Sequence, residues 1–181
     1  MSQLHIYSDS RPGVALQKSS SPKDIARLLG LAGVRFEQWQ AGADIAAGDS
    51  QDKVLKAYDK DISRLVNEEG YQTVDVISIR ADNPDKEALR QKFLSEHTHS
   101  EDEVRFFVEG KGLFSLHIGE KVYEVLCEKG DLISVPANTP HWFDMGPEPH
   151  LVAIRFFNNQ EGWVAHYTGS EIADQFSRLD S

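Results

Sequence analysis

The chain has 181 residues, with 19 Lys and Arg against 29 Asp and Glu, so its formal net charge is −10. This length suits one domain, and so acidic a chain is repelled by phosphate backbones and anionic lipid, which excludes nucleic acid and membrane surfaces as expected partners. The sequence has no apolar run of the roughly 18 residues that a spanning helix needs, and no apolar signal segment. With Cys127 as the single cysteine, we expect a cytoplasmic protein without an intrachain disulfide.

The first 94 residues predict an alternation of strands and helices. Ser21-Pro22 followed by Asp24 is typical of a helix start, with a capping serine and a proline at the first helical position. Between Ser50 and Gly70, apolar residues recur at three- and four-residue steps, which predicts one longer helix. A third helix is expected from Asn83 through Phe93. The expected strands are residues 4–7, 34–40 and 71–80, with a loop at 41–49.

From His97 onward the pattern changes to short β-type runs separated by glycine and proline. The expected strands are residues 104–108, 113–118, 121–127, 131–135, 151–157 and 163–168. Several short strands at this spacing favour an antiparallel barrel or sandwich. We therefore predict a single, mainly β domain with an α/β part at residues 1–94, a barrel at 95–169 and a tail at 170–181.

The segment from His97 to Glu103, HTHSEDE, contains the densest cluster of metal-binding side chains. Two histidines at positions i and i+2 of a strand project to the same face, so His97 and His99 can reach one metal ion. Glu103 follows four residues after His99, and a carboxylate with neutral imidazoles suits Fe, Ni, Mn or Zn. Taken alone, the segment also fits a solvated acidic loop with chance histidines.

A second segment, from Gly130 to His141, predicts a strand, a tight turn and a histidine that opens the next strand. Pro136 fixes the entry to the turn, and Asn138 tolerates a left-handed backbone. His141 can then face the first two histidines across a barrel. Alone, it is equally consistent with a histidine satisfied within its turn.

Together the two segments resemble the motifs of the cupin superfamily, His97-x-His99-x3-Glu103-x6-Gly110 and Gly130-x5-Pro136-x-Asn138-x2-His141. Three residues depart from the usual pattern, Gln91, Asn138 and Met145, and none of them is a ligand position. Longer stretches are similar to the acireductone dioxygenase family of cupins. These stretches are residues 33–39, 76–80, 89–99, 102–110 and 133–146, and the likeness extends over most of residues 21–169.

The resemblance implies a fold, a reaction and a ligand set. The fold is the cupin barrel, a double-stranded β-helix of the jelly-roll kind. Family members oxidise 1,2-dihydroxy-3-keto-5-methylthiopentene with O2 in methionine salvage. With Fe(II) they form formate and 4-methylthio-2-oxobutanoate, and with Ni(II) they form formate, carbon monoxide and 3-methylthiopropanoate. The ligands carried over are His97, His99, Glu103 and His141, which would hold one Fe(II) or Ni(II) per chain.

Elementary coordination chemistry is compatible with this reaction. Four protein ligands on an octahedral ion leave two positions, which an ene-diolate can fill as a chelate. Arg105 shares strand parity with Glu103 and Phe107, so we expect it to point into the same cavity and stabilise a dianionic substrate. The alternative is a surface arginine paired with Glu101 or Asp102.

The remaining candidates each have two interpretations. Arg155 lies in an otherwise apolar strand, so it is either paired in the core or lines the site. The aromatic residues Phe93, Phe143 and Trp163 either surround the methylthio tail or simply pack in the core. Glu96 and Asp102 either hydrogen-bond a ligand imidazole or assist metal loading, or they are solvated loop charges.

Two other functions remain open at this point. One is a different cupin metalloenzyme, such as a sugar-phosphate isomerase with Zn or Mn, although few basic residues are available for a phosphate. The other is a non-catalytic cupin that binds a small ligand. The sequence leaves no long apolar surface stripe, so we expect a monomer whose partners are the small acireductone and O2.

Overall fold

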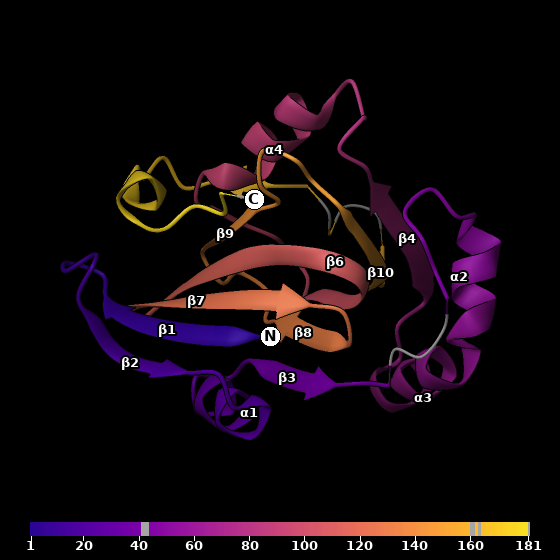
Figure 1. The fold of residues 1–181 in the computed structure, drawn as a ribbon. Helices are drawn as coiled ribbons and strands as arrows, with labels where there is room; N and C mark the ends of the chain where they lie inside the picture. Colours follow the sequence, from indigo (N-terminus) through magenta and orange to yellow (C-terminus); the bar gives the residue numbers. More distant parts are fainter. Residues whose placement is uncertain (41–43, 160–161, 163, 181) are drawn as a thin grey trace.

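The computed structural model of the protein describes residues 1–40, 44–159, 162 and 164–180. Antiparallel strands form its centre, and the helices lie around them (Figure 1). The strands are β1 (Gln3–Ser8), β2 (Ala15–Ser19), β3 (Arg35–Gln38), β4 (Thr73–Ile79), β5 (His97–Thr98), β6 (Glu103–Ile118), β7 (Lys121–Glu128), β8 (Asp131–Val135), β9 (His141–Asp144), β10 (Leu151–Phe157) and β11 (His166–Tyr167). The helices are α1 (Pro22–Leu31), α2 (Gln51–Ala57), α3 (Asp59–Glu69), α4 (Lys86–Leu94) and the short 3-10 helix η2 (Ile172–Gln175).

The long strand β6 belongs to both halves of the barrel. Its first part pairs with β8 and β10, and its second part pairs with β7 and β9. One row of strands therefore runs β11-β5-β9-β6-β7-β1-β2, and the other runs β3-β8-β6-β10-β4. Strands from the first 94 residues thus complete both rows.

The expectation of two separate strands at residues 104–108 and 113–118 was wrong, because β6 is continuous. Gly110 has a φ of 78°, and a Cβ there would lie 1.8 Å from the carbonyl oxygen of His150, so the glycine lets two backbones approach closely. Next to it, Val152 pairs with Glu109 while Ala153 pairs with Phe107, which leaves Val108 as the extra residue of a bulge. The glycine bends the strand without ending it.

Three clusters of buried apolar side chains stabilise the fold. The first fills the interior and includes Phe107, Phe114 and Phe143. The second joins α2 and α3 to the outer side of the β4-containing row, where Trp39, Tyr58 and Phe156 pack around Phe106. In Figure 1 these two helices lie beside β4, and α4 lies near β9. The third cluster is small and packs the C-terminal segment, with Phe176, against Tyr7 and Trp142.

The helix starts follow the local signals in the sequence. The Ser21 hydroxyl accepts a hydrogen bond from the Asp24 N–H at the start of α1, and the Ser50 hydroxyl accepts from the Lys53 N–H at the start of α2. The single helix expected between Ser50 and Gly70 is wrong, because the chain breaks at Tyr58 (φ −114°, ψ 21°) into α2 and α3. The buried Tyr58 ring packs edge-on against Phe106, and this tertiary contact overrides the continuous apolar stripe.

The last expected strand, residues 163–168, is reduced to β11, and Trp163 lies outside the described residues.

Across the part of the chain that the structure describes, every helix is too short or too polar to cross a lipid bilayer.

Candidate metal centre

Three strands bring the histidines and Glu103 together. His97 opens β5, His99 follows directly after it, Glu103 opens β6 and His141 opens β9. In the ladder His97 pairs with His141, and His141 pairs with Leu116 of β6. Because residues that lie opposite one another in a sheet share a face, these side chains meet inside the barrel. The left-handed Asn138 (φ 62°), in the turn before β9, confirms the tight turn expected there.

The geometry of the three imidazoles suits a metal ion. One ligand atom from each of His97, His99 and His141 lies within 4.8 Å of the others, and all three residues are buried. Glu103 Oε2 lies 2.6 Å from His141 Nε2 and 3.5 Å from His99 Nε2. These four residues are the candidate ligands that the two sequence motifs contain.

Main-chain carbonyls orient all three imidazoles. Nδ1 of His97 donates to the Ser95 carbonyl at 2.7 Å, Nδ1 of His141 to the Thr139 carbonyl at 2.8 Å, and Nδ1 of His99 to the Val164 carbonyl at 3.2 Å. A carbonyl oxygen only accepts hydrogen bonds, so the proton lies on Nδ1 and the Nε2 lone pair faces the centre. Hydrogen bonds of this kind typically orient metal-binding histidines.

Unpaired acceptor atoms meet at the centre. Among the described residues, His99 Nε2, His141 Nε2 and Glu103 Oε2 are buried without a hydrogen-bond partner. Two acceptors at 2.6 Å repel each other unless a positive charge lies between them, and buried polar atoms are rarely left unsatisfied. The arrangement therefore fits a divalent cation held by nitrogen and oxygen donors.

Burial and neighbouring charges prepare these groups for metal binding. Burial, together with the nearby His141, lowers the pKa of His97 from 6.5 to about 4, and burial also lowers the pKa of His99. For Glu103, burial raises the pKa, but the charges of Arg105 and His141 outweigh it and hold the pKa below its usual value. At neutral pH the site thus offers two neutral imidazoles and a carboxylate.

His141 differs from the other two histidines. Burial lowers its pKa, but the adjacent carboxylate of Glu103 outweighs burial and raises the pKa above 6.5. The carboxylate of Glu103 thus favours a proton on His141 and competes with the burial of the imidazole. A metal ion that binds here displaces this proton, which couples metal binding to proton release.

Arg105 is buried in the interior of the barrel beside Glu103, in agreement with its strand parity. Its Nη2 atom is 2.7 Å from Glu103 Oε1, and the side chain is buried. Three aromatic rings surround the guanidinium, with its carbon 5.9 Å from Phe93, 5.8 Å from Phe114 and 5.6 Å from Phe143. The alternative of a surface arginine paired with Glu101 or Asp102 is therefore wrong.

Sequence reasoning missed Phe114 as part of this aromatic wall. Counting alternate residues along β6 from Glu103 places Phe114 on the opposite face. The extra residue at Val108 reverses that count, so Phe114 points inward with Phe107. A bulge has no reliable signature in one sequence, although Gly110 and Gly112 marked the place where it was possible.

Arg155 makes a partly buried, bidentate ion pair with Asp75 on the inward face of the β4–β10 pair. Its Nε and Nη2 atoms lie 2.8 and 2.6 Å from the two carboxylate oxygens of Asp75, which faces it across the strands. On its other side Arg155 pairs in register with Arg105. Opposed residues share a face, so Arg155 lies on the inward face with Arg105, and its charge lowers the pKa of Arg105 after the larger effect of burial.

Neither Glu96 nor Asp102 hydrogen-bonds a ligand imidazole in the described chain, because main-chain carbonyls already occupy each Nδ1. Glu96 instead accepts from Thr168 Oγ1 at 2.8 Å and lies 2.7 Å from Nδ1 of His117. Asp102 accepts from the Ala137 N–H at 2.9 Å and so fixes the turn that leads to His141. The hydrogen-bonding expectation was wrong for both, while a role in metal loading stays a prediction.

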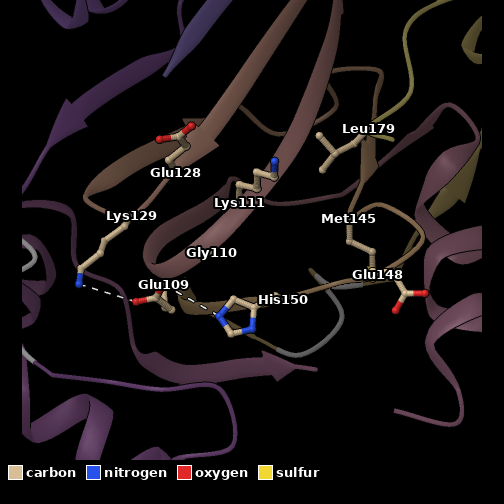
Figure 2. Close-up of a pocket in the computed structure, with 9 residues that line it drawn as sticks. All are labelled: Glu109, Gly110, Lys111, Glu128, Lys129, Met145, Glu148, His150 and Leu179. Atoms are coloured by element: carbon tan, nitrogen blue, oxygen red, sulfur yellow. Dashed lines mark ion pairs between the residues drawn. The ribbon is translucent and has the colours of Figure 1, made fainter. Parts of the chain in front are cut away.

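A different hollow lies away from these residues, around the bend of β6. Figure 2 shows its lining, which includes Glu109, Lys111, Lys129 and His150, and its volume is about 380 Å³. Glu109 lies six residues beyond Glu103, so an extended chain separates the two by roughly 20 Å. The charges of this hollow partly pair with one another, Lys129 at 3.7 Å and His150 at 4.0 Å from Glu109. It lacks the buried converging donors of the metal centre.

Comparison with known proteins agrees with the geometry. The ARD/ARD' family model matches residues 3–165 of the chain. The chain belongs to the acireductone dioxygenase family. Acireductone dioxygenase of Alcanivorax borkumensis is 64% identical over 178 residues, covering 98% of each chain, and that of Klebsiella oxytoca is 59% identical over 179 residues, covering 99% of each.

A solved structure extends the likeness to the fold. Acireductone dioxygenase from Bacillus anthracis, with a cadmium ion in its active centre, superimposes with a TM-score of 0.82 at 31% identity, over 92% of this chain and 98% of that one. Membership of the family makes the protein a metal-dependent dioxygenase with a cupin fold, and both expectations are confirmed. The cluster of His97, His99 and His141 is its candidate metal site.

Proposed function

We propose that the protein oxidises the acireductone 1,2-dihydroxy-3-keto-5-methylthiopentene with O2 as a step of methionine salvage. The names of its relatives support this substrate. The observation that carries the proposal is the pairing of two features in one apolar enclosure, a cation-fitting set of donors and a buried arginine 2.7 Å from Glu103. A metal and a fixed positive charge together suit an anionic chelating substrate.

His97, His99, Glu103 and His141 would hold one Fe(II) or Ni(II). When bound, such a metal would supply Lewis acidity toward the oxygens of the substrate and redox chemistry toward O2. The three imidazoles are held with Nε2 toward the centre by carbonyl groups of the chain. Glu103 contributes one negative charge, so the site keeps a net positive charge that attracts the ene-diolate.

Arg105 binds and stabilises the substrate's negative charge. Its guanidinium is buried among Phe93, Phe114 and Phe143, where water is largely excluded and charge interactions are strong. A substrate that loses its second proton gains more from this fixed cation than the monoanion does. We infer that Arg105 favours formation of the dianion that reacts with O2.

We further propose that the metal selects the products. The Fe(II) protein forms 4-methylthio-2-oxobutanoate and formate, and the Ni(II) protein forms 3-methylthiopropanoate, formate and carbon monoxide. The chain offers the same donors to either ion, so the difference belongs to the ion and to the way it holds the substrate.

The test uses one batch of metal-free protein, reconstituted separately with Fe(II) and with Ni(II). Both samples receive the acireductone and O2, and O2 uptake, formate and carbon monoxide are measured. Carbon monoxide is expected from the nickel sample alone. Identical products from two verified single-metal samples contradict metal-selected products, and no O2 uptake in either favours the isomerase or the binding module.

We also propose that the chain acts as a single-domain, cytoplasmic monomer. Support for one domain comes from β1, β3 and β4, which pair with β7, β8 and β10 and so tie the first 94 residues to the barrel. Sedimentation equilibrium of the metal-loaded protein measures its oligomeric state, and a mass of twice the chain contradicts the monomer.

A further inference from the structure

Tyr167 stands at the end of the row of side chains that contains the candidate ligands. In register, Tyr167 of β11 pairs with His97, His97 pairs with His141, and His141 pairs with Leu116. Directly opposed residues of antiparallel strands point to the same face. Tyr167 therefore faces the metal side of the sheet, and β11 is the outermost strand of its row.

The ring of Tyr167 is held firmly although it is 55% exposed. Its centre lies 5.9 Å from that of the His97 ring, and its hydroxyl donates to the Lys92 carbonyl at 2.7 Å. The next residue, Thr168, donates from its N–H to the Glu96 carbonyl at 3.1 Å. A large ring fixed on both sides and still facing solvent is a preformed contact surface, because little further conformational entropy is lost when a ligand covers it.

Phe93 is a second aromatic ring close to His97. Its ring centre lies 6.3 Å from that of His97, and it follows Lys92, the residue whose carbonyl anchors Tyr167. Both rings thus lie close to His97, Phe93 from α4 and Tyr167 from β11. Phe93 also lies 5.9 Å from the Arg105 guanidinium, so the pair extends from the charged interior to the surface.

We propose that Tyr167 is a specificity-determining residue whose ring, with Phe93, contacts the apolar tail of the substrate. The inference rests on the proposed function, in which the polar end of the acireductone lies at the metal and Arg105. The tail must then extend away from these groups, and the aromatic surface beside His97 leads outward. A thioether is well suited to contact aromatic rings, because its polarizable sulfur packs favourably at their edges.

The experiment compares Tyr167→Ala and Tyr167→Phe with the wild type, all loaded with the same metal. Leu31→Ala is the control, because Leu31 is an exposed apolar residue at the end of α1. Two acireductones are used, the full substrate and a truncated one that ends in a methyl group. Binding is measured by calorimetry without O2, where no turnover occurs, and kcat and KM are measured with O2.

For Tyr167→Ala we expect the anaerobic Kd and the KM of the full substrate to rise about tenfold, a usual value for an apolar contact. The same constants for the truncated substrate should change less than about twofold, with metal content unchanged. Tyr167→Phe keeps the ring and should bind the full substrate within about threefold of the wild type. Leu31→Ala should match the wild type throughout.

Equal losses for both substrates, or a loss of bound metal, would overturn the proposal, because Tyr167 would then only attach β11 to α4. Unchanged binding of the full substrate by Tyr167→Ala would overturn it as well. Failure of the proposed function gives a different result, no O2 uptake by the wild type with either acireductone. In that case the anaerobic binding measurements still decide the role of Tyr167, and no binding of either compound overturns both.

Discussion

Arg105 and Glu103 share one buried environment, and each limits what the other can do. Their 2.7 Å contact keeps Glu103 ionised, and the ionised Glu103 keeps a buried guanidinium tolerable. In the metal-loaded protein the positive charge of the ion would also balance the negative charge of Glu103. In the proposed function, Arg105 is then the positive charge that the substrate meets among the rings of Phe93, Phe114 and Phe143.

Replacing Arg105 by Ala should lower kcat about 100-fold, the usual effect of removing one fixed group that stabilises developing negative charge. Metal content should not change, because the proposed ligands remain. Arg105→Lys should restore little activity, since an ammonium lacks the planar, forked geometry of the guanidinium. Steady-state kinetics and elemental analysis of each variant test this, and wild-type kinetics in Arg105→Ala would contradict a role at the substrate.

His117 is a second charged residue, on the opposite face of the sheet from the metal centre. Its Nδ1 lies 2.7 Å from Glu96, and its Nε2 lies 3.1 Å from Asp9, which follows β1. Burial lowers its pKa, but the two carboxylates outweigh burial and raise the pKa above 6.5. The imidazole of His117 thus connects Asp9, next to the β1–β2 hairpin, to Glu96, the residue that precedes His97.

The sign of this shift predicts how stability depends on pH. A pKa raised on folding means that the folded chain holds the proton more tightly, so the stabilisation is complete below pH 6.5 and is lost as pH rises through the raised pKa. The free energy of unfolding of the wild type should exceed that of His117→Gln by about 1 kcal/mol at pH 6, and this difference should shrink toward pH 9.

Urea unfolding of both proteins across this pH range measures the difference. His150→Gln is the matched control, because His150 is exposed and lies 4.0 Å from a single carboxylate, Glu109. His150→Gln should change the free energy of unfolding only slightly across this pH range. A difference between wild type and His117→Gln that grows with pH would contradict the charged state of His117.

At the scale of elements, the bend of β6 decides which side chains reach the interior. The strand supplies Glu103 and Arg105 before the bend and Phe114 after it. Gly110 lets the main chain of His150 and Leu151, at the start of β10, approach β6 closely. A Cβ at Gly112 would lie 2.2 Å from the Phe143 ring. Gly112 therefore makes room for Phe143, which lies beside Arg105, and Gly110 makes room for the main chain at the start of β10.

Gly110→Ala should destabilise the protein by about 3 to 4 kcal/mol, since it adds the strain of a left-handed backbone to a collision with the His150 carbonyl. Gly119→Ala is the matched control, because Gly119 also has a positive φ (62°) but no described atom lies within 4 Å of its added Cβ. Gly119→Ala should lower the free energy of unfolding by only about 1 to 2 kcal/mol. Equal losses in denaturant unfolding would mean that the close approach at Gly110 is not important.

Local signals in the sequence predicted the element starts better than the element lengths. Ser21 and Gly70 mark helix ends through their own hydrogen bonds or backbone angles, and such effects depend only on near neighbours. The break at Tyr58 depends instead on Phe106, 48 residues later in the chain. No periodicity within residues 50–70 contains that information.

The same distinction applies to the candidate site. The four proposed ligands and Arg105 lie in two short motifs with fixed parity, so the sequence placed them together. The partners of Glu96 and Arg155 are His117 and Asp75, and neither pair is close in sequence. Ion pairs between distant strands depend on sheet register, which a bulge such as that at Val108 shifts by one residue.

At the scale of the whole molecule, a metal ion would link the neighbouring strands β5 and β6 to β9, which lies far from them in sequence. His97 and His141 are separated by 44 positions, and Glu103 lies on the strand that both rows share. An ion that binds only the folded chain stabilises it by mass action. The metal is therefore expected to stabilise the fold in addition to its role in the reaction.

Removing the metal should lower the melting temperature by roughly 10 °C. This follows from about 4 kcal/mol of stabilisation at a metal concentration 1,000 times Kd and 2–4 °C per kcal/mol for a chain of this size. Calorimetry with and without a chelator measures the change, under anaerobic conditions for Fe(II). In His141→Ala the metal should no longer raise the melting temperature, and an undiminished rise would contradict the ligand assignment.

The three carbonyls of Ser95, Thr139 and Val164 that orient the imidazoles belong to the main chain. A point mutation at these positions changes the side chain but leaves the carbonyl in place, so such mutations can accumulate in evolution without changing the histidine tautomers. An inserted or deleted residue in the same segments moves the carbonyl itself. The site is thus robust to substitution and vulnerable to changes in chain length, so relatives can diverge in sequence here while keeping the spacing between these residues.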